Sequence, residues 1–351
     1  MGDIHTGVLQ DYKRLTKRRL VKLTAGLGLC AVSLITDIMI GPSWLKPAEL
    51  FNALFNPGSV SITSSVIVWT LRLPQALMAI GVGAALGLAG ASMQTILNNP
   101  LASPYTLGVS TGAGFGAALA IVFGASLTGG VFGAYLVPAF AFAFSILTCM
   151  VIYFLARSRN LSSETMILSG IGMSFLFQSL QSFLQYISTP EALQSIVFWL
   201  FGSLSKSNWF TVAMIYAALA LIMPVMMLDA WKLTALKLGD EKARTLGVHV
   251  EHLRIKVFLL ISLLTSIAVC FVGVIGFIGM VGPHIARILV GEDQRFFIPL
   301  SVIFGAAILS LASVASKLVS HGAMLPIGII MGFIGVPFFF SLILGKRRVS
   351  I

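Results

Sequence analysis

The chain has 351 residues, of which 57% are hydrophobic and only 10% are charged, and its mean hydropathy is +0.97. Soluble globular proteins carry about 25% charged residues, so this composition excludes an ordinary soluble domain. The formal net charge of +11 does not indicate a nucleic-acid partner, because the basic residues lie between long apolar runs, as they do in membrane proteins.

Apolar runs of about 18 residues or more recur along the chain, and each is long enough to cross a hydrocarbon layer about 30 Å thick as a helix. A basic stretch precedes the first run, which lacks a small-residue cleavage pattern, so we expect a retained first span. The expected fold is all-α, a single polytopic transmembrane domain over residues 1–351. The predicted spans, about ten in all, cover residues 21–42, 73–97, 105–125, 132–156, 165–187, 209–229, 254–273, 275–290, 297–317 and 326–345.

Two segments are not expected to be straight spans. The run at 275–290 is interrupted by several glycines and by Pro283, which predicts a short, broken helix. The segment 189–208 contains an apolar stretch at 196–201 that is too short to cross a membrane. We expect a helix lying at the outer surface there.

The basic residues divide unequally between the two sides of the predicted membrane. If the N-terminus is cytoplasmic, all but four of the 23 Lys and Arg residues fall on the cytoplasmic side. The four outer ones are Lys46, Arg72, Lys206 and Lys317. By the positive-inside rule, both termini are expected in the cytoplasm of a bacterial or archaeal cell, with the chain in its inner (cytoplasmic) membrane.

A cytoplasmic loop at about 230–253 has mixed charge and a helix-forming composition. Within it, Asp240 and Glu241 begin a predicted short helix and Gly247 ends it. Such a rigid projection is where a partner protein would dock and pass on a movement.

Polar residues mark two candidate parts of a pathway. Asn98 and Asn99 lie in a polar, proline-punctuated turn between two glycine-rich spans, which fits either the cytoplasmic end of a pathway or a plain loop. Gln178, Gln181 and Gln185 recur at helical spacing on the fifth span. This stripe suits a pathway for a large hydrogen-bonding ligand, although hydrogen bonds between helices are an equal alternative.

The sequence holds no signal for catalysis or metal binding. It lacks a P-loop and an HExxH motif, and its three cysteines show no paired spacing, so we expect no catalytic residues, no metal site and no enzyme. Ionisable residues are nearly absent from the predicted spans, and Asp37 is expected to reach the membrane interface. This pattern disfavours an ion-coupled secondary transporter, which stays an alternative beside a membrane structural or assembly protein.

Several motifs occur together and in order over nearly the whole chain: Arg72–Pro74, Gly90–Gly114, Gly239–Val248, Gly276–Arg295 and Leu325–Phe339. With these motifs the chain resembles the iron-siderophore, haem and vitamin B12 permeases of ABC importers. The resemblance implies a type II importer fold with ten spans per subunit. It also implies a second permease subunit, identical or paralogous, two cytoplasmic ATP-binding cassette subunits that bind ATP and Mg, and an extracytoplasmic binding protein.

The resemblance also implies roles for particular residues. The segment with Gly239, Asp240, Glu241, Ala243, Leu246 and Gly247 corresponds to the coupling helix that enters a groove on the ATPase. Ser162 and Ser163 correspond to the inner gate, and Arg72 and Lys317 to basic positions that dock the binding protein. A second basic residue is frequent just after the RLP motif in this family, and Gln75 stands there instead, which predicts weaker docking. The implied function is ATP-driven import of a ferric siderophore, with haem and cobalamin left open.

Overall fold

The computed structural model describes residues 2–41, 46–124, 131–159, 161–319 and 325–345. Helices account for 84% of the structure, and the described residues contain no strand. Seven of the helices are long and apolar enough to cross a membrane, and three shorter apolar helices accompany them. Together they match the predicted spans, so the prediction of an all-α polytopic membrane protein is confirmed.

The elements follow one another with short connections. The first half consists of α1 (Gly2–Met39), α2 (Pro47–Phe55), α3 (Ile62–Val66), α4 (Leu73–Ile96), α5 (Val109–Gly124), α6 (Val131–Arg157) and α7 (Ser163–Ile187). The second half consists of α8 (Pro190–Leu200), α9 (Trp209–Leu228), α10 (Ala230–Leu236), α11 (Asp240–Thr245), α12 (Val250–Val272), α13 (Ile278–Val290), α14 (Gln294–Val319) and α15 (Ile327–Gly345).

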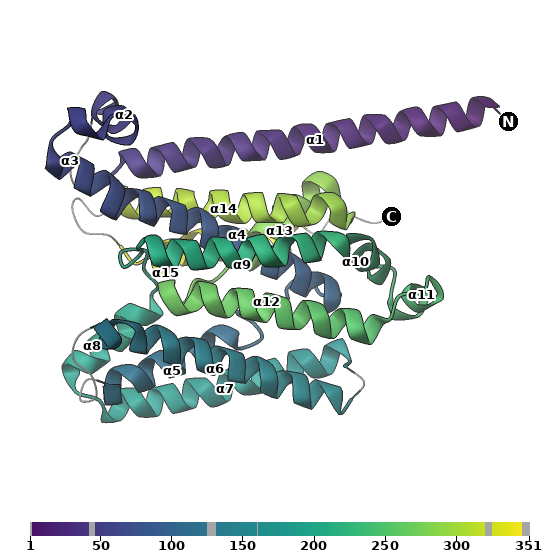
Figure 1. Ribbon diagram of the computed structural model, residues 1–351. Helices are drawn as coiled ribbons and strands as arrows, with labels where there is room; N and C mark the ends of the chain where they lie inside the picture. Colours follow the sequence, from purple (N-terminus) through teal and green to yellow (C-terminus); the bar gives the residue numbers. More distant parts are fainter. Residues whose placement is uncertain (1, 42–45, 125–130, 160, 320–324, 346–351) are drawn as a thin grey trace.

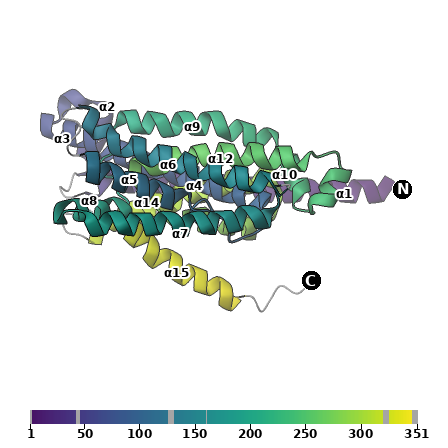
Figure 2. The ribbon, with the colours of Figure 1, turned by 90° about the horizontal axis from the view of Figure 1, so that it is seen from below.

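The long helices run side by side, so the bundle has two ends (Figure 1). One end holds α10 and α11, and α1 begins there; we call it the α11 end. The opposite end holds α2, α3 and α8, and we call it the α8 end. α15 leaves the bundle at an angle and runs back toward the α11 end (Figure 2). The predicted surface helix in 189–208 is present as α8, at the end opposite the predicted cytoplasmic loop.

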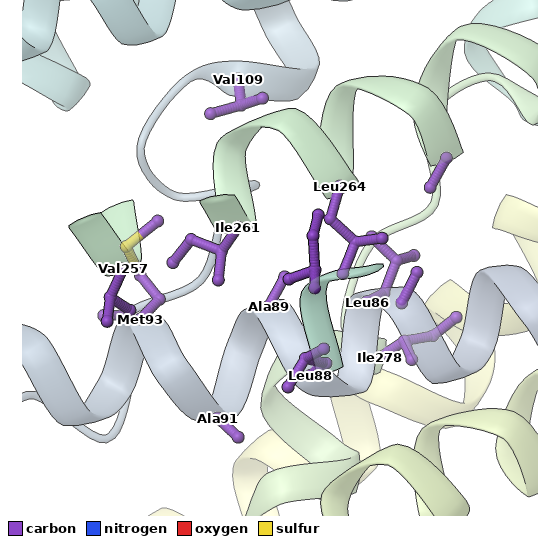
Figure 3. Close-up of a cluster of buried hydrophobic side chains, with 14 of the residues drawn as sticks. Leu86, Leu88, Ala89, Ala91, Met93, Val109, Val257, Ile261, Leu264 and Ile278 are labelled. Carbon is purple, nitrogen blue, oxygen red and sulfur yellow. The ribbon is translucent and has the colours of Figure 1, made fainter. Parts of the chain in front are cut away.

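The centre of the bundle is α4, whose residues are almost all buried. Its glycines let neighbouring helices approach closely: a Cβ on Gly90 would lie 1.9 Å from the carbonyl oxygen of Gly279, and one on Gly87 would lie 2.3 Å from that of Ser301. Small residues allow such packing in lipid. On its remaining faces α4 carries larger side chains that pack against α12, as Leu86 and Met93 do beside Leu264 and Val257 (Figure 3).

Two regions differ from straight spans, one as predicted and one not. The broken eighth span is present: residues 273–276 are not helical, and α13 is only 13 residues long. Residues 47–72, for which the sequence patterns indicate no span, form α2, the 3₁₀ turn Pro57–Ser59, α3 and a π-helical turn Ile67–Arg72. This turn joins α3 to α4, so the second membrane helix begins at Ile62 rather than at 73.

Candidate functional site

The predicted cytoplasmic loop folds into two short helices at the α11 end. α10 packs against the bundle with Leu233 and Leu236 buried, whereas α11 stands out from it (Figure 1). The predicted short helix of this loop is therefore present as α11.

Glycines close both ends of α11. Gly239 has a φ of +103° and Gly247 a φ of +81°, values that side-chain-bearing residues rarely adopt. Between them Ala243 is buried against the bundle, while Glu241 and Leu246 are exposed. The projecting helix thus has a fixed orientation and offers side chains to a partner.

Arg254, at the start of α12, connects three segments at this end. Its Nε donates a hydrogen bond to the carbonyl oxygen of Ile96 at the end of α4, at 2.9 Å, and Nη1 donates to the carbonyl oxygen of Leu161, also at 2.9 Å. Nη2 donates to both carboxylate oxygens of Asp240 in α11, at 3.0 and 3.2 Å. The sequence patterns do not predict that Arg254 joins these segments. From them, Arg254 is only one of the basic residues expected on the cytoplasmic side.

A second chain of polar contacts joins α10 to α4 and α13. Lys237 Nζ donates to Asn98 Oδ1 at 3.0 Å and lies 3.8 Å from Glu292 Oε1. Glu292 accepts from Arg287 Nε at 2.8 Å, and Arg287 also donates to Gln94 Oε1 at 2.7 Å. Burial lowers the pKa of Lys237, and the carboxylate of Glu292 opposes this effect. The segment before α11 is thus tied to the ends of two further helices.

A cavity of about 600 Å³ lies beside these contacts, between α10 and the loop from α13 to α14. It is lined by Asn98, Trp231, Thr234, Lys237, Leu238, Glu292, Asp293 and Arg295. Charges of both signs alternate there with exposed apolar side chains, so the recess can receive a protein surface of mixed character.

The predicted gate lies at the start of α7. Ser162 is the N-cap of this helix, and its hydroxyl accepts a hydrogen bond from the Thr165 amide at 3.2 Å. Ser163 is the first helical residue. Leu161, directly before them, has a φ of +54° and is the residue whose carbonyl Arg254 binds. Arg254 therefore binds both Asp240 of the predicted coupling helix and Leu161, the residue directly before the predicted gate.

The remaining pathway candidates separate into two places. Asn98 and Asn99 form the turn after α4: Asn98 has a φ of +45°, and Asn99 Oδ1 accepts from the Leu101 amide at 2.9 Å. Both residues lie at the α11 end, where the Asn98 side chain binds Lys237 and the Asn99 side chain stabilises the turn.

The glutamine stripe lies on α7, outside the packed core of the chain. Gln178 is exposed, and Gln181 and Gln185 are half-buried. In the described part of the chain, none of their side chains makes a hydrogen bond to another helix. The role of these glutamines stays a prediction.

Charged residues at the α8 end differ from the sequence-based expectation. Asp37 is 0% exposed and the Lys317 side chain 2% exposed, and Lys317 Nζ lies 2.7 Å from Asp37 Oδ1. Ser313 also donates to this carboxylate, at 2.9 Å. The expectation that Asp37 reaches the membrane interface is wrong, because α1 packs along α14 and places the carboxylate against Lys317. Two of the few ionisable residues in the predicted spans, Asp37 in 21–42 and Lys317 in 297–317, thus form a buried ion pair.

Arg72 is buried as well. Its Nη1 donates to the carbonyl oxygens of Ile38 and Met39, at 3.0 and 2.8 Å, in the last turn of α1. Gln75, the departure from the family pattern, is also buried. The two basic residues predicted to dock a binding protein thus point into the protein here. Their docking role stays a prediction, and it requires these side chains to leave their internal partners.

Comparison with known proteins agrees with this fold and these motifs. The sequence profile described as the FecCD transport family matches residues 29–345. A protein of Methanocaldococcus jannaschii named as an ABC transporter permease, MJ0087, is 39% identical over 95% of this chain and 97% of its own length. The vitamin B12 import system permease protein BtuC of Yersinia enterocolitica is 32% identical, over 91% of each chain.

A solved structure has the same fold. It is described as an inward-facing conformation of a metal-chelate type ABC transporter, and it superposes with a TM-score of 0.81 at 32% sequence identity. The match covers 92% of this chain and 98% of that one. The helices described above therefore follow a known transporter architecture over almost their whole length.

Proposed function

This chain belongs to the FecCD transport family and is a multi-pass permease of the metal-chelate type of ABC importer. On this premise we propose that it imports a ferric siderophore or a similar metal chelate by ATP-driven alternating access. Two separate cytoplasmic subunits bind and hydrolyse the ATP, since the chain has no P-loop of its own. A second permease subunit, identical or paralogous, completes the pathway.

The projection of α11 from the bundle is the observation that carries the proposal. Its exposed Glu241 and Leu246 suit a groove on an ATPase subunit, and the cavity beside α10 gives that subunit a further recess to fill. In this proposal the α11 end faces the cytoplasm. α1 begins at this end, and its Lys and Arg residues, which all lie between Lys13 and Lys22 and so precede its apolar run, agree with the positive-inside rule.

The proposed cycle begins when ATP closes the two ATPase subunits. α11 moves with its ATPase, the ends of α4 and α7 rearrange, and a chelate passes from its binding protein at the α8 end into the pathway. The glutamine stripe on α7 suits this pathway because neutral amides hydrogen-bond a large ligand without holding it by charge. Because some relatives are named for vitamin B12 import, a corrinoid is a second candidate cargo, and haem is a third.

An uptake assay tests the proposal. The chain would be reconstituted in proteoliposomes with its ATPase and binding protein, and offered labelled ferric siderophore, haem and cobalamin in parallel. We expect uptake of one ligand that ceases without ATP or without the binding protein. Uptake driven by an ion gradient alone would overturn the proposal in favour of a secondary transporter.

The buried pair of Asp37 and Lys317 is the feature that an ion-coupled alternative would use. It does not favour that alternative, because the two groups are engaged with each other and belong to α1 and α14, whereas the glutamine stripe belongs to α7. The double variant Asp37→Asn/Lys317→Met separates the two proposals in the same assay, since it leaves no unpaired buried charge and an ion-coupled carrier that used this carboxylate would lose its gradient dependence.

A further inference from the structure

The contacts of Arg254 reach three segments that lie far apart in the sequence. Asp240 is 14 residues away from it, Leu161 is 93 and Ile96 is 158. The three belong to α11, to the turn before α7 and to the end of α4. These are the projecting helix and the termini of two helices beside the predicted pathway.

An arginine can hold such a junction in a fixed geometry. Its guanidinium is planar and carries five donors in a rigid fork, so acceptors bound along its edges keep their relative positions. The carbonyl of Ile96 has no partner within its own helix, because it lies in the last turn of α4. The contact with Asp240 is the one that joins the guanidinium to an opposite charge.

The burial of the two charged partners is unequal. The Arg254 side chain is 4% exposed, whereas the Asp240 side chain is 44% exposed. The guanidinium is thus held within the bundle, and the carboxylate of Asp240 connects α11 to this guanidinium. A shift of α11 pulls on Arg254 and, through it, on the ends of α4 and α7.

We propose that Arg254 is the positioning residue that transmits the movement of α11 to the ends of α4 and α7. This role rests on the proposed function, and it adds a named mechanical link between the ATPase contact and the gate. Loss of the link leaves α11 able to follow the ATPase while the gate no longer follows α11.

The variant Asp240→Asn tests the link with little risk to folding. It removes the charge from a half-exposed side chain and leaves the two carbonyl contacts of Arg254 in place. Arg254→Lys is the second variant, since an ammonium keeps the charge but cannot serve three directions in one plane. Lys256→Gln is the matched control: it lies on the same helix and pairs with a different carboxylate, that of Asp229.

Each variant would be reconstituted with the ATPase and binding protein, and two rates would be measured, ATP hydrolysis and ligand uptake. Because an ion pair with a half-exposed carboxylate such as Asp240 is worth about a factor of five or less in an equilibrium, we expect about a two- to fivefold rise in ATP consumed per ligand for Asp240→Asn. A larger rise is expected for Arg254→Lys, and none for Lys256→Gln. For Asp240→Asn and Lys256→Gln, hydrolysis itself and the thermal unfolding midpoint should stay near those of the unaltered protein, whereas Arg254→Lys should also lower the midpoint because two buried carbonyl oxygens lose donors.

Three results would speak against this role. An unchanged ratio of ATP to ligand in both variants would overturn it. A parallel loss of hydrolysis, uptake and ATPase co-purification would also overturn it, because Arg254 would then serve only to shape the docking surface. If the unaltered chain shows no ATP-dependent uptake, the proposed function fails, and this role fails with it.

Discussion

The two ends of the bundle both bury arginine or lysine side chains, but they use them differently. At the α8 end Lys317 binds Asp37 near the end of α1, and Arg72 also donates to the last turn of α1, so the charge of Lys317 fixes one helix in place. At the α11 end Arg254 binds three separate segments. A buried cation with partners on one element acts as an anchor, and one with partners on several elements can act as a junction.

The difference also shows in the carboxylates. Asp37 is enclosed together with Lys317, so neither charge can leave without the other being stranded in an apolar setting. Asp240 is half-exposed and can move with α11. We therefore expect variants at the α8 end to affect stability most, and variants at the α11 end to affect coupling most.

The largest effect is expected from Lys317→Met. Removing the ammonium leaves the Asp37 carboxylate buried without its cation, and breaking a buried pair in this way costs about 3–5 kcal/mol. The unfolding midpoint of the purified protein in detergent should fall sharply. The double variant Asp37→Asn/Lys317→Met should regain most of the loss, because no charge is then left unpaired.

Lys206→Met is the matched control, since it removes an exposed lysine at the same end. If Lys317→Met unfolds at the same temperature as this control but loses affinity for the binding protein, then Lys317 is a docking residue and the assignment as an anchor is wrong.

A smaller effect on stability and a larger one on transport are expected at α11. Gly247→Val forces a φ of +81° on a β-branched residue, which costs about 1–2 kcal/mol locally, and it should displace the end of the helix. Replacing Glu241 with tryptophan should block the ATPase groove. Either change should uncouple ATP hydrolysis from uptake, while membrane insertion stays normal. Insertion would be measured as the amount of the chain in the membrane fraction. Undiminished uptake by both variants would refute the coupling role of α11.

Much of the fold could be predicted because its signals are local. Hydrophobic run length identified the spans, and the closing glycines identified α11. The short helix in 275–290 was recognisable from its glycines and proline, and the break lies before it, where Gly273 has a φ of +77°, whereas Pro283 lies inside α13. The π-helical turn before α4 and the short helices at 47–66 escaped prediction, because nothing in run length separates an irregular helical surface segment from a loop.

The candidate site was predictable only in part, and distance along the sequence explains why. The helix of Asp240 was recognisable from its own residues, but its partner Arg254 binds residues up to 158 positions away, and a single sequence carries no signal for such pairs. The same reason explains the error at Asp37. Its depth depends on how α1 packs along α14, nearly 280 residues later.

The smallest expected effect concerns Asp229, at the junction of α9 and α10. Burial by itself would raise the pKa of this carboxyl, but Lys232 and Lys256 donate to it and lower the pKa overall. A lowered pKa in the folded state means that the contribution to stability is complete above the unfolded value of about 4 and is lost as the pH falls through the folded value. Both lysines are more than one-third exposed, so each pair contributes about 1 kcal/mol or less.

Asp229→Asn should therefore lower the unfolding midpoint slightly at neutral pH, and its midpoint should converge with that of the unaltered protein as the pH is lowered below about 4. Glu164→Gln, which removes an exposed carboxylate at the start of α7, is the control for the change in net charge and should lack this convergence. A midpoint difference for Asp229→Asn that stayed constant down to low pH would show that the loss comes from the altered shape of the side chain. In that case the two lysines would not hold the α9–α10 junction by charge, and the contacts of Arg254, of Lys237 and of Thr234 with the Gln294 amide would still link α10 and α11 to the bundle.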